Sequence, residues 1–199
     1  MVDILKYIMT FIDTSGAIMY LNLINFNKLS SSNPLIELCG SGGYRSILPM
    51  TEVWRMKSND RENIMNVLRG RLCNELDLLY IDHGVNDFWY LKFVLDCEIR
   101  PNVICVSYNP CIPFEKSITA PFMRKTGVGD ETNYNKSSLR ALCIVLPRYV
   151  LWKCTDNHFA VFVEEKVACR IPKVESHIVM HPERWNQIYK KFWVDVRPK

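Results

Sequence analysis

The chain has 199 residues, of which 48% are hydrophobic and 23% are charged, a composition typical of one globular domain rather than a disordered segment. Its net charge of +4 permits an anionic ligand but lacks the dense positive charge of a dedicated nucleic-acid binder. The longest apolar stretch, residues 17–26, is interrupted by Asn22 and Asn25 and is too short to span a bilayer, so we expect no membrane partner.

The eight cysteines are scattered and form no Cys-x-x-Cys pair. Several lie in apolar runs, which favours reduced, buried thiols and a cytoplasmic location. One combination of side chains raises the question of a zinc site, but it contains no closely spaced pair of ligands, so we expect no metal. These side chains are Cys154, His158, His177 and His181.

In chain order, residues 2–12 have the apolar spacing of an amphipathic helix, and residues 16–29 leave helix and strand open. From residue 34 onward, short apolar runs alternate with helical patterns. The predicted strands are residues 34–39, 51–56, 76–82, 102–109, 149–155 and 158–165. The predicted helices are residues 58–70, 86–98, 134–148 and 182–193.

Uniformly apolar strands that alternate with helices predict an α/β fold. We expect a mainly parallel sheet with helices on both faces and a C-terminal antiparallel hairpin. The whole chain, 1–199, is predicted to be one domain. It would comprise an N-terminal helical segment (1–33), a core (34–165) and a C-terminal extension (166–199), and its ends suit a domain excised from a longer polypeptide.

A glycine-rich turn follows the predicted strand 34–39, with glycines at positions 40, 42 and 43. Such a turn exposes backbone N–H groups and lets a ligand approach the main chain closely. The spacing departs from the Gly-x-Gly-x-x-Gly of dinucleotide sites. Because Glu37 opens the stretch with an acidic side chain, the turn favours S-adenosylmethionine, and a tight turn without a ligand is the alternative.

Polar residues close the next two predicted strands, where ligands of open α/β sheets bind. Asp82 ends one strand and is followed by the polar and aromatic group 86–89. Tyr108 and Asn109 end the next. The competing interpretations are a helix cap at residues 86–87 and a plain turn before Pro110.

Taken in order, the segments CGSGG, IDHGVNDFW, VICVSYN, YNKSSLRAL and HFAVFV resemble class I S-adenosylmethionine-dependent methyltransferases, which have a Rossmann-like fold. The resemblance is strongest to a group with an IDIDGNDYW strand end, an EYN strand end and a GASL helix start. Residues of this chain that fall on those motifs are Asp82, Asn86, Asp87, Trp89, Tyr108, Asn109, Tyr134, Ser138 and Leu139. The glycine turn is also similar to that of RNA cap guanine-N7 methyltransferases, and the composition suggests a viral replicase domain.

The resemblance implies a cofactor, S-adenosyl-L-methionine, and a partner, the 5′ cap guanine of RNA, with other viral replicase subunits as further partners and the host cytoplasm as location. The expected catalytic residues are Asp82, Tyr108 and Asn109. The expected cofactor-binding residues are Glu37, Cys39, Gly40, Ser41, Gly42, Asp60, Asp82 and His83. The expected substrate-binding residues are Asn86, Asp87, Trp89, Tyr134, Arg124 and Lys136, with Phe114 as a further stacking candidate and Arg140 as a further phosphate contact.

Guanine N7 is the preferred acceptor because its lone pair needs no general base, so that proximity and alignment suffice. A ribose 2′-O-methyltransferase is the nearest rival. The resemblance implies that such an enzyme activates the hydroxyl with a Lys-Asp-Lys-Glu set. Asp82 and Glu164 fit the two acidic positions of this set, but the strand 102–109 lacks the lysine expected there. A small-molecule or sugar O-methyltransferase would use His83 or Asp82 as base. The irregular glycine motif also leaves open a non-catalytic RNA-binding module on a degenerate methyltransferase fold.

Overall fold

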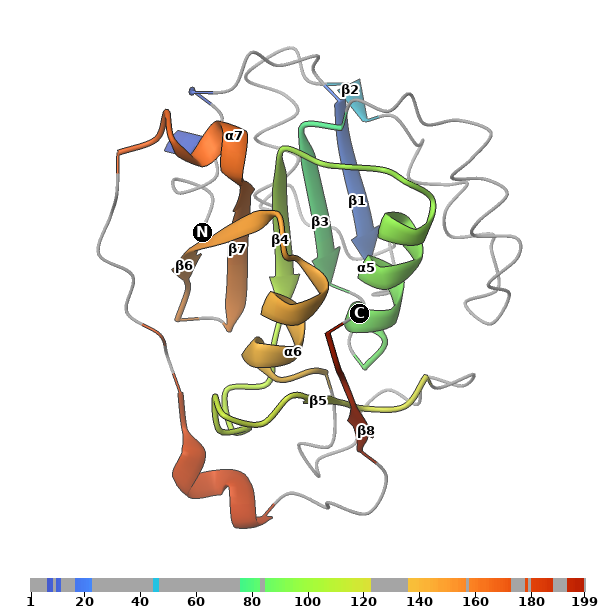
Figure 1. Ribbon diagram of the computed structural model, residues 1–199, viewed down its shortest axis with the longest axis vertical. Helices are drawn as coiled ribbons and strands as arrows, with labels where there is room; N and C mark the ends of the chain where they lie inside the picture. Colours follow the sequence, from blue (N-terminus) through green and yellow to red (C-terminus); the bar gives the residue numbers. More distant parts are fainter. Residues whose placement is uncertain are drawn as a thin grey trace, which may run out of the picture.

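The structure is a computed structural model in which the central and C-terminal parts of the chain are the best described (Figure 1). The described residues are 7–8, 10–11, 17–22, 45–46, 76–82, 85–122, 136–156, 158–172, 178, 180–187 and 193–198. Within these residues the fold is α/β, as expected. The predicted strands 34–39 and 51–56 and the predicted helix 58–70 lie outside the described residues.

A mixed six-stranded sheet forms the centre, in the order β2-β1-β3-β4-β7-β6. Strands β2, β1, β3 and β4 are mutually parallel, whereas β7 runs antiparallel to both β4 and β6. The bounds are β1 Ala17–Asn22, β2 Arg45–Ser46, β3 Leu78–Asp82, β4 Val103–Ser107, β6 Tyr149–Cys154 and β7 Phe159–Glu164. Of the predicted parallel strands, 76–82 and 102–109 are therefore confirmed, and so is the C-terminal hairpin.

The neighbour of β3 differs from the prediction. We expected the strand before the glycine turn to lie beside β3, with Glu37, Asp82 and Asn109 at adjacent strand ends. Instead, β1 pairs with β3 on one side and β4 pairs with it on the other, so both edges of β3 are occupied. The pattern of residues 16–29 was ambiguous because asparagines interrupt its apolar run, yet the paired segment 17–22 is extended.

Strands β3, β4 and β7 are mostly apolar because both of their faces are covered. One set of alternate side chains, including Leu79, Ile104 and Phe162, packs beneath α5 (Asp87–Asp96) and α6 (Leu139–Val145), which Figure 1 shows on the same face. The opposite set, including Tyr80 and Val161, packs with Ile8 and with Val167 of α7 (Glu165–Ala168). Helical cover by α5 and α6 on one face agrees with the prediction, and on the other face the described cover is Ile8 and the short helix α7.

Helix α6 begins at Leu139, later than residue 134, because Ser138 adopts an extended backbone and caps it. The Ser138 hydroxyl oxygen accepts a hydrogen bond from the Ala141 N–H at 3.0 Å, which satisfies one of the free donors of the first turn. The helix ends at Val145, two residues before Pro147, whose ring does not fit a continuing helix.

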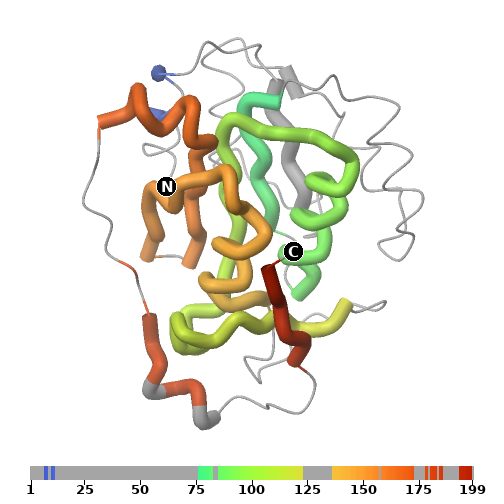
Figure 2. The backbone as a smooth tube through the Cα atoms, in the orientation of Figure 1, coloured from blue at the N-terminus to red at the C-terminus, as the bar shows by residue number. Residues whose placement is uncertain are grey.

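The hairpin strand β6 has a register shift between Leu151 and Lys153, at Trp152. A second, two-stranded sheet joins β5 (Ile118–Thr119) to β8 (Val194–Asp195), which runs antiparallel to it. Residues 182–187 form a 3₁₀ helix, Pro182–Gln187, where an α-helix was predicted. Figure 2 shows this 3₁₀ segment well away from α7 and the 193–198 segment beside α5.

Six of the eight cysteines are described, and no disulfide joins any two of these six. Cys105, Cys111 and Cys154 are buried, as expected for several of them, while Cys169 is exposed. In the described part of the chain, none of the helices combines the length and the apolar character that crossing a membrane requires.

Candidate functional site

The carboxyl ends of the parallel strands form one edge of the sheet, and the register aligns their last residues. Asn22 of β1 pairs with Asp82 of β3, and Ser107 of β4 pairs with Phe159 of β7. Since Ile81 pairs with Val106, the register continues from Asp82 to Ser107. A single row therefore crosses four strands at the edge where open α/β sheets bind their ligands.

Asp82 is the carboxylate of this row, and it is only partly buried. Burial raises the pKa of its carboxyl above the usual value, while the positive charge of Lys136 acts in the opposite direction. The charge of Lys136 thus influences Asp82, although these two predicted site residues are 54 positions apart in the sequence. A carboxylate with a nearby cation at a strand end is suited to hold a polar or charged ligand.

Asn86 and Asp87, predicted to contact substrate, are both 0% exposed. The Ser107 hydroxyl donates a hydrogen bond to the Asp87 carboxylate, which ties the start of α5 to the end of β4. The side chains of Asn86 and Tyr90 are hydrogen-bonded to each other. Asn86 occupies the cap position of α5 but makes no side-chain cap bond. In this conformation both residues act inside the protein, as positioning residues.

Tyr108 and Asn109, predicted to be catalytic, are also buried, at 0% and 3% exposure. The side chain of Tyr108 is hydrogen-bonded to that of Cys154. The Asn109 side-chain oxygen accepts the Cys111 N–H at 3.0 Å and so shapes the turn after β4. Neither side chain is exposed at the surface, where a substrate would bind. For Asn109, the contact with Cys111 fits the competing interpretation of a plain turn before Pro110.

Four basic side chains from three segments lie near the end of β4. The Lys136 ammonium lies 6.0 Å from the centre of the Phe159 ring. The imidazoles of His158 and His181 meet edge to face, with ring centres 5.9 Å apart. Burial lowers the pKa of His158, and neighbouring positive charges lower it further, which places all four residues in one electrostatic environment. We call this group the basic cluster, and its members are Lys136, His158, His181 and Arg184.

Glu164 was considered as a partner of Asp82 in a hydroxyl-activating set, and the register contradicts this. Because β7 runs antiparallel to β4, its end at Glu164 lies beside the start of β4, next to Val103. Asp82 lies at the other edge of the sheet. Glu164 instead pairs with Lys166 at 2.8 Å.

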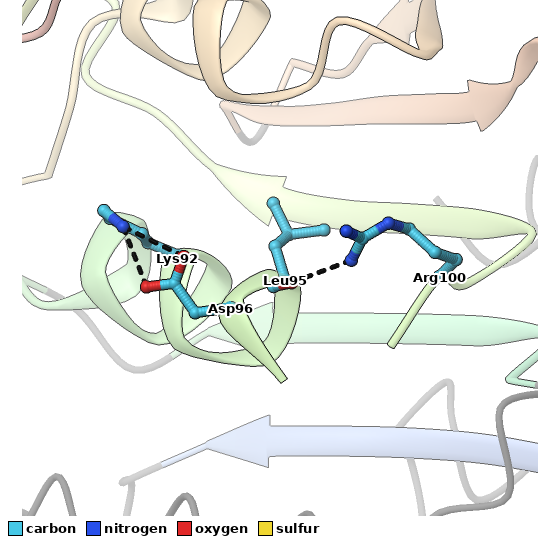
Figure 3. Close-up of polar contacts among 4 residues, drawn as sticks. All are labelled: Lys92, Leu95, Asp96 and Arg100. Atoms are coloured by element: carbon cyan, nitrogen blue, oxygen red, sulfur yellow. Dashed lines mark hydrogen bonds and ion pairs between the residues drawn. The ribbon is translucent and has the colours of Figure 1, made fainter. Parts of the chain in front are cut away.

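Trp89, another predicted substrate contact, lines a pocket of about 550 Å³ between α5, the end of α6 and residues 194–198. The Trp89 indole N–H donates a hydrogen bond to the Ala120 carbonyl oxygen at 2.8 Å. The pocket extends to Arg100, whose guanidinium donates to the Leu95 carbonyl, and to the Lys92–Asp96 ion pair (Figure 3). Asp82 does not line this pocket, so Trp89 is separate from the row of strand ends.

The remaining predicted site residues fall outside the part of the chain that the structure describes, so their assignments stay predictions. They are Glu37, Cys39, Gly40, Ser41, Gly42, Asp60, His83, Arg124 and Tyr134.

Sequence reasoning missed that His158, His181 and Arg184 lie near one another. His158 and His181 were weighed only as zinc ligands, and no group of three or more His, Cys, Asp or Glu residues is placed to hold a metal among the described residues. Their proximity depends on the turn before β7 and on the bond from the His181 N–H to the Pro110 carbonyl, at 2.7 Å. No sequence signal foretells that long-range contact.

No protein-family model, curated protein or solved structure matches this chain. The functional argument therefore depends on the chemistry of the row of strand ends and of the basic cluster.

Proposed function

We propose that this protein is an S-adenosylmethionine-dependent methyltransferase that acts on the guanine N7 of an RNA cap. The observation that carries the proposal is the row of strand ends, in which Asp82 lies at the carboxyl edge of parallel strands and is influenced by the positive charge of Lys136. Crevices at this edge are the general ligand site of open α/β sheets.

The environment of Asp82 suits the cofactor. S-adenosylmethionine, when bound, supplies a methyl group on a positively charged sulfonium. A partly buried carboxyl whose pKa is raised by desolvation gains from a nearby cation, since the positive charge favours its ionised form. The glycine turn predicted to hold the rest of the cofactor lies outside the described residues.

The surroundings of β4 favour an acceptor that needs no proton removed. Tyr108 and Asn109 are buried and held by hydrogen bonds, so the end of β4 offers no exposed base. Guanine N7 has an available lone pair, and its methylation relies on alignment of the acceptor with the methyl group.

An exposed aromatic group near the same edge supports an RNA substrate. Phe114, 39% exposed, follows β4 in the chain, and the Arg140 guanidinium lies 5.9 Å from its ring centre. Aromatic faces and arginine planes are the surfaces on which unpaired RNA bases stack.

The test is methyl transfer from radiolabelled donor to uncapped RNA, guanosine-capped RNA and RNA with an N7-methylated cap. We expect incorporation only on the unmethylated cap. Asp82→Asn should reduce the rate by about a hundredfold through misplacement of the reactants, whereas Asp96→Asn, on the solvent side of α5, should leave it within about twofold. Absence of incorporation on every RNA, together with no calorimetric heat from S-adenosylhomocysteine, would reject the proposal and favour a non-catalytic RNA-binding module.

The electrostatic influence of Lys136 on Asp82 gives one specific reason to keep a second candidate, ribose 2′-O-methylation. A hydroxyl acceptor must lose its proton, and a lysine and a carboxylate at one site are able to assist that loss. The absence of lysine from β4 had counted against this activity, but Lys136 reaches the same edge from another segment. Incorporation restricted to the pre-methylated cap would select this candidate.

A further inference from the structure

The end of β4 is enclosed by two residues with a left-handed backbone, Lys136 and His158, whose φ angles are 64° and 62°. This region favours glycine, and a bulky side chain there costs free energy. The third described residue of this kind, Glu98, follows α5, where such a backbone is a common way to end a helix. Lys136 and His158 do not end a helix, and each has a basic side chain on a residue whose backbone conformation is unfavourable.

Hydrogen bonds of the main chain fix both residues around β4. The Tyr108 N–H donates to the His158 carbonyl at 3.0 Å, and the Asn109 N–H donates to the carbonyl of Ser137, the residue after Lys136, at 2.8 Å. The turn before β7 is closed by the bond from the His158 N–H to the Thr155 carbonyl, at 2.9 Å. The two side chains are therefore carried by a rigid frame.

One atom of the cluster lacks the partner that a buried polar atom requires. The His158 Nδ1 is buried and has no hydrogen-bond partner. Buried polar atoms of this kind are uncommon, and an ion or water that binds nearby is one of their physical explanations. The imidazole of His158 also contacts the ring of Tyr108, with centres 6.4 Å apart, and that of His181.

Most of the charges that act on His158 are positive. The positive charges of His181, Lys136 and Arg184 lower the pKa of His158. Asp156 raises this pKa, and its influence is the weakest of the four. Asp82 lies close to Lys136 and partly offsets its charge. Two permanent cations and two imidazoles thus meet two carboxylates, and a protonated imidazole would leave an excess of positive charge.

We infer that the basic cluster binds a phosphate group, and that in the cell this group belongs to the phosphate chain of the capped RNA. The identity of the RNA rests on the proposed function, whereas phosphate binding does not. Lysine, arginine and protonated histidine donate charge-assisted hydrogen bonds to phosphate oxygens. The site lies at the carboxyl edge of the sheet, beside Asp82, where the phosphate chain would hold the cap near the methyl donor.

Binding should be coupled to protonation of His158. In the free protein, burial and the neighbouring positive charges lower the pKa of His158, so that it is neutral at pH 7. A bound phosphate would offset those charges and raise the pKa. The complex then holds more protons than the free protein, and affinity should increase as the pH falls from about 7.5 to about 6.5.

The probe is inorganic pyrophosphate, titrated calorimetrically into the full chain at low salt. Lys136→Gln combined with Arg184→Gln should weaken binding at least about tenfold, because two charge-assisted contacts are lost. The matched control is Lys92→Gln, which removes one positive charge from α5, where Lys92 is paired with Asp96, and should change affinity less than about twofold. The inference is overturned if pyrophosphate does not bind at millimolar concentration, or if the control loses as much affinity as the double variant.

A second measurement keeps the inference testable if the double variant does not fold. The imidazole NMR signals of the wild-type chain are followed during the titration, with His158 assigned from His158→Gln. We expect the His158 signal to shift and its pKa to rise, and the pH dependence of affinity to weaken in His158→Gln. Pyrophosphate binding that leaves the His158 signal unchanged would overturn the site.

The inference and the proposed function can fail independently. Pyrophosphate binding at the cluster without methylation of any RNA would retain the phosphate site and reject the cap methyltransferase. Methylation of capped RNA with an unchanged KM in the Lys136→Gln, Arg184→Gln double variant would retain the enzyme and reject the site.

Discussion

The ends of β3 and β4 are adjacent in the sheet and both are polar in sequence, but their environments are opposite. Tyr108 and Asn109, after β4, are buried and hydrogen-bonded within the protein. Asp82, at the end of β3, is partly exposed and has a raised pKa. A polar residue at a strand end is therefore not by itself a site. What separates the two ends is whether the protein satisfies the side chain internally.

Ser107→Ala should produce the largest effect, because it acts on the internally satisfied end. The change removes the hydroxyl that donates to the buried Asp87 and leaves that carboxyl short of a donor, at a cost of about 2–3 kcal/mol in unfolding free energy. Urea denaturation measures it. Ser117→Ala, which removes a bond to the partly buried Val196 carbonyl, is the comparison and should cost about 1 kcal/mol. Equal costs would contradict the importance of the Asp87 contact.

Tyr108→Phe tests whether the end of β4 has only a structural role. Loss of the hydrogen bond to Cys154 should cost about 1 kcal/mol and leave methyl transfer within about twofold of the wild type. Burial raises the pKa of the Cys154 thiol to about 11, so it remains a neutral partner at physiological pH. A large loss of activity with normal stability would instead restore Tyr108 to the catalytic residues.

Asp82→Asn should show the opposite behaviour, with a small gain in stability at pH 7 and loss of activity. The folded protein holds the Asp82 proton more tightly than the unfolded chain, because burial raises the carboxyl pKa. Above that raised pKa, the ionised carboxylate therefore lowers the free energy of unfolding, and the neutral amide removes this penalty. Thermal melting at pH 7 measures the gain, and a lower Tm for the variant would show that Asp82 is structural.

Acidification should reveal His158 through the smallest effect. The unfolded chain binds a histidine proton near pH 6.5, whereas the folded protein binds it only at lower pH. Between those values the unfolded state holds more protons, so stability decreases as the pH falls through this window. Melting temperatures at pH 7.5 and 5.5 should differ more for the wild type than for His158→Gln. The same pH dependence in both would place the effect on other groups.

The sequence predicted the elements that local pattern determines. The apolar runs that became β3, β4 and β7 have both faces covered, and the hairpin β6–β7 is closed by a short turn. These features depend on neighbouring residues, and so a single sequence reveals them. The start of α6 was missed, because the predicted helix began at residue 134, whereas Ser138 caps a helix that begins at Leu139.

The rest depends on contacts between distant segments. Nothing local decides that 17–22 lies beside β3, because its asparagines break both the strand and the helix patterns. Asn86 and Asp87 are buried because α5 packs on β4, whereas their polar residue types alone would predict exposure. The basic cluster needs a turn at residue 158 and a contact from residue 181 to Pro110. The sequence therefore predicted which side chains end β3 and β4, but not which of them the fold buries.

The irregular pairing of β6 has a consequence for the behaviour of the chain in concentrated solution. In the described sheet β6 is the last strand on its side, so its outer backbone groups are available as a template for another chain. The shift at Trp152 interrupts that row of donors and acceptors and increases the local twist, and such irregularities make an outer strand a poor match for a regular one. The same irregularity that places Trp152 in the interior thus also protects the protein from edge-to-edge aggregation.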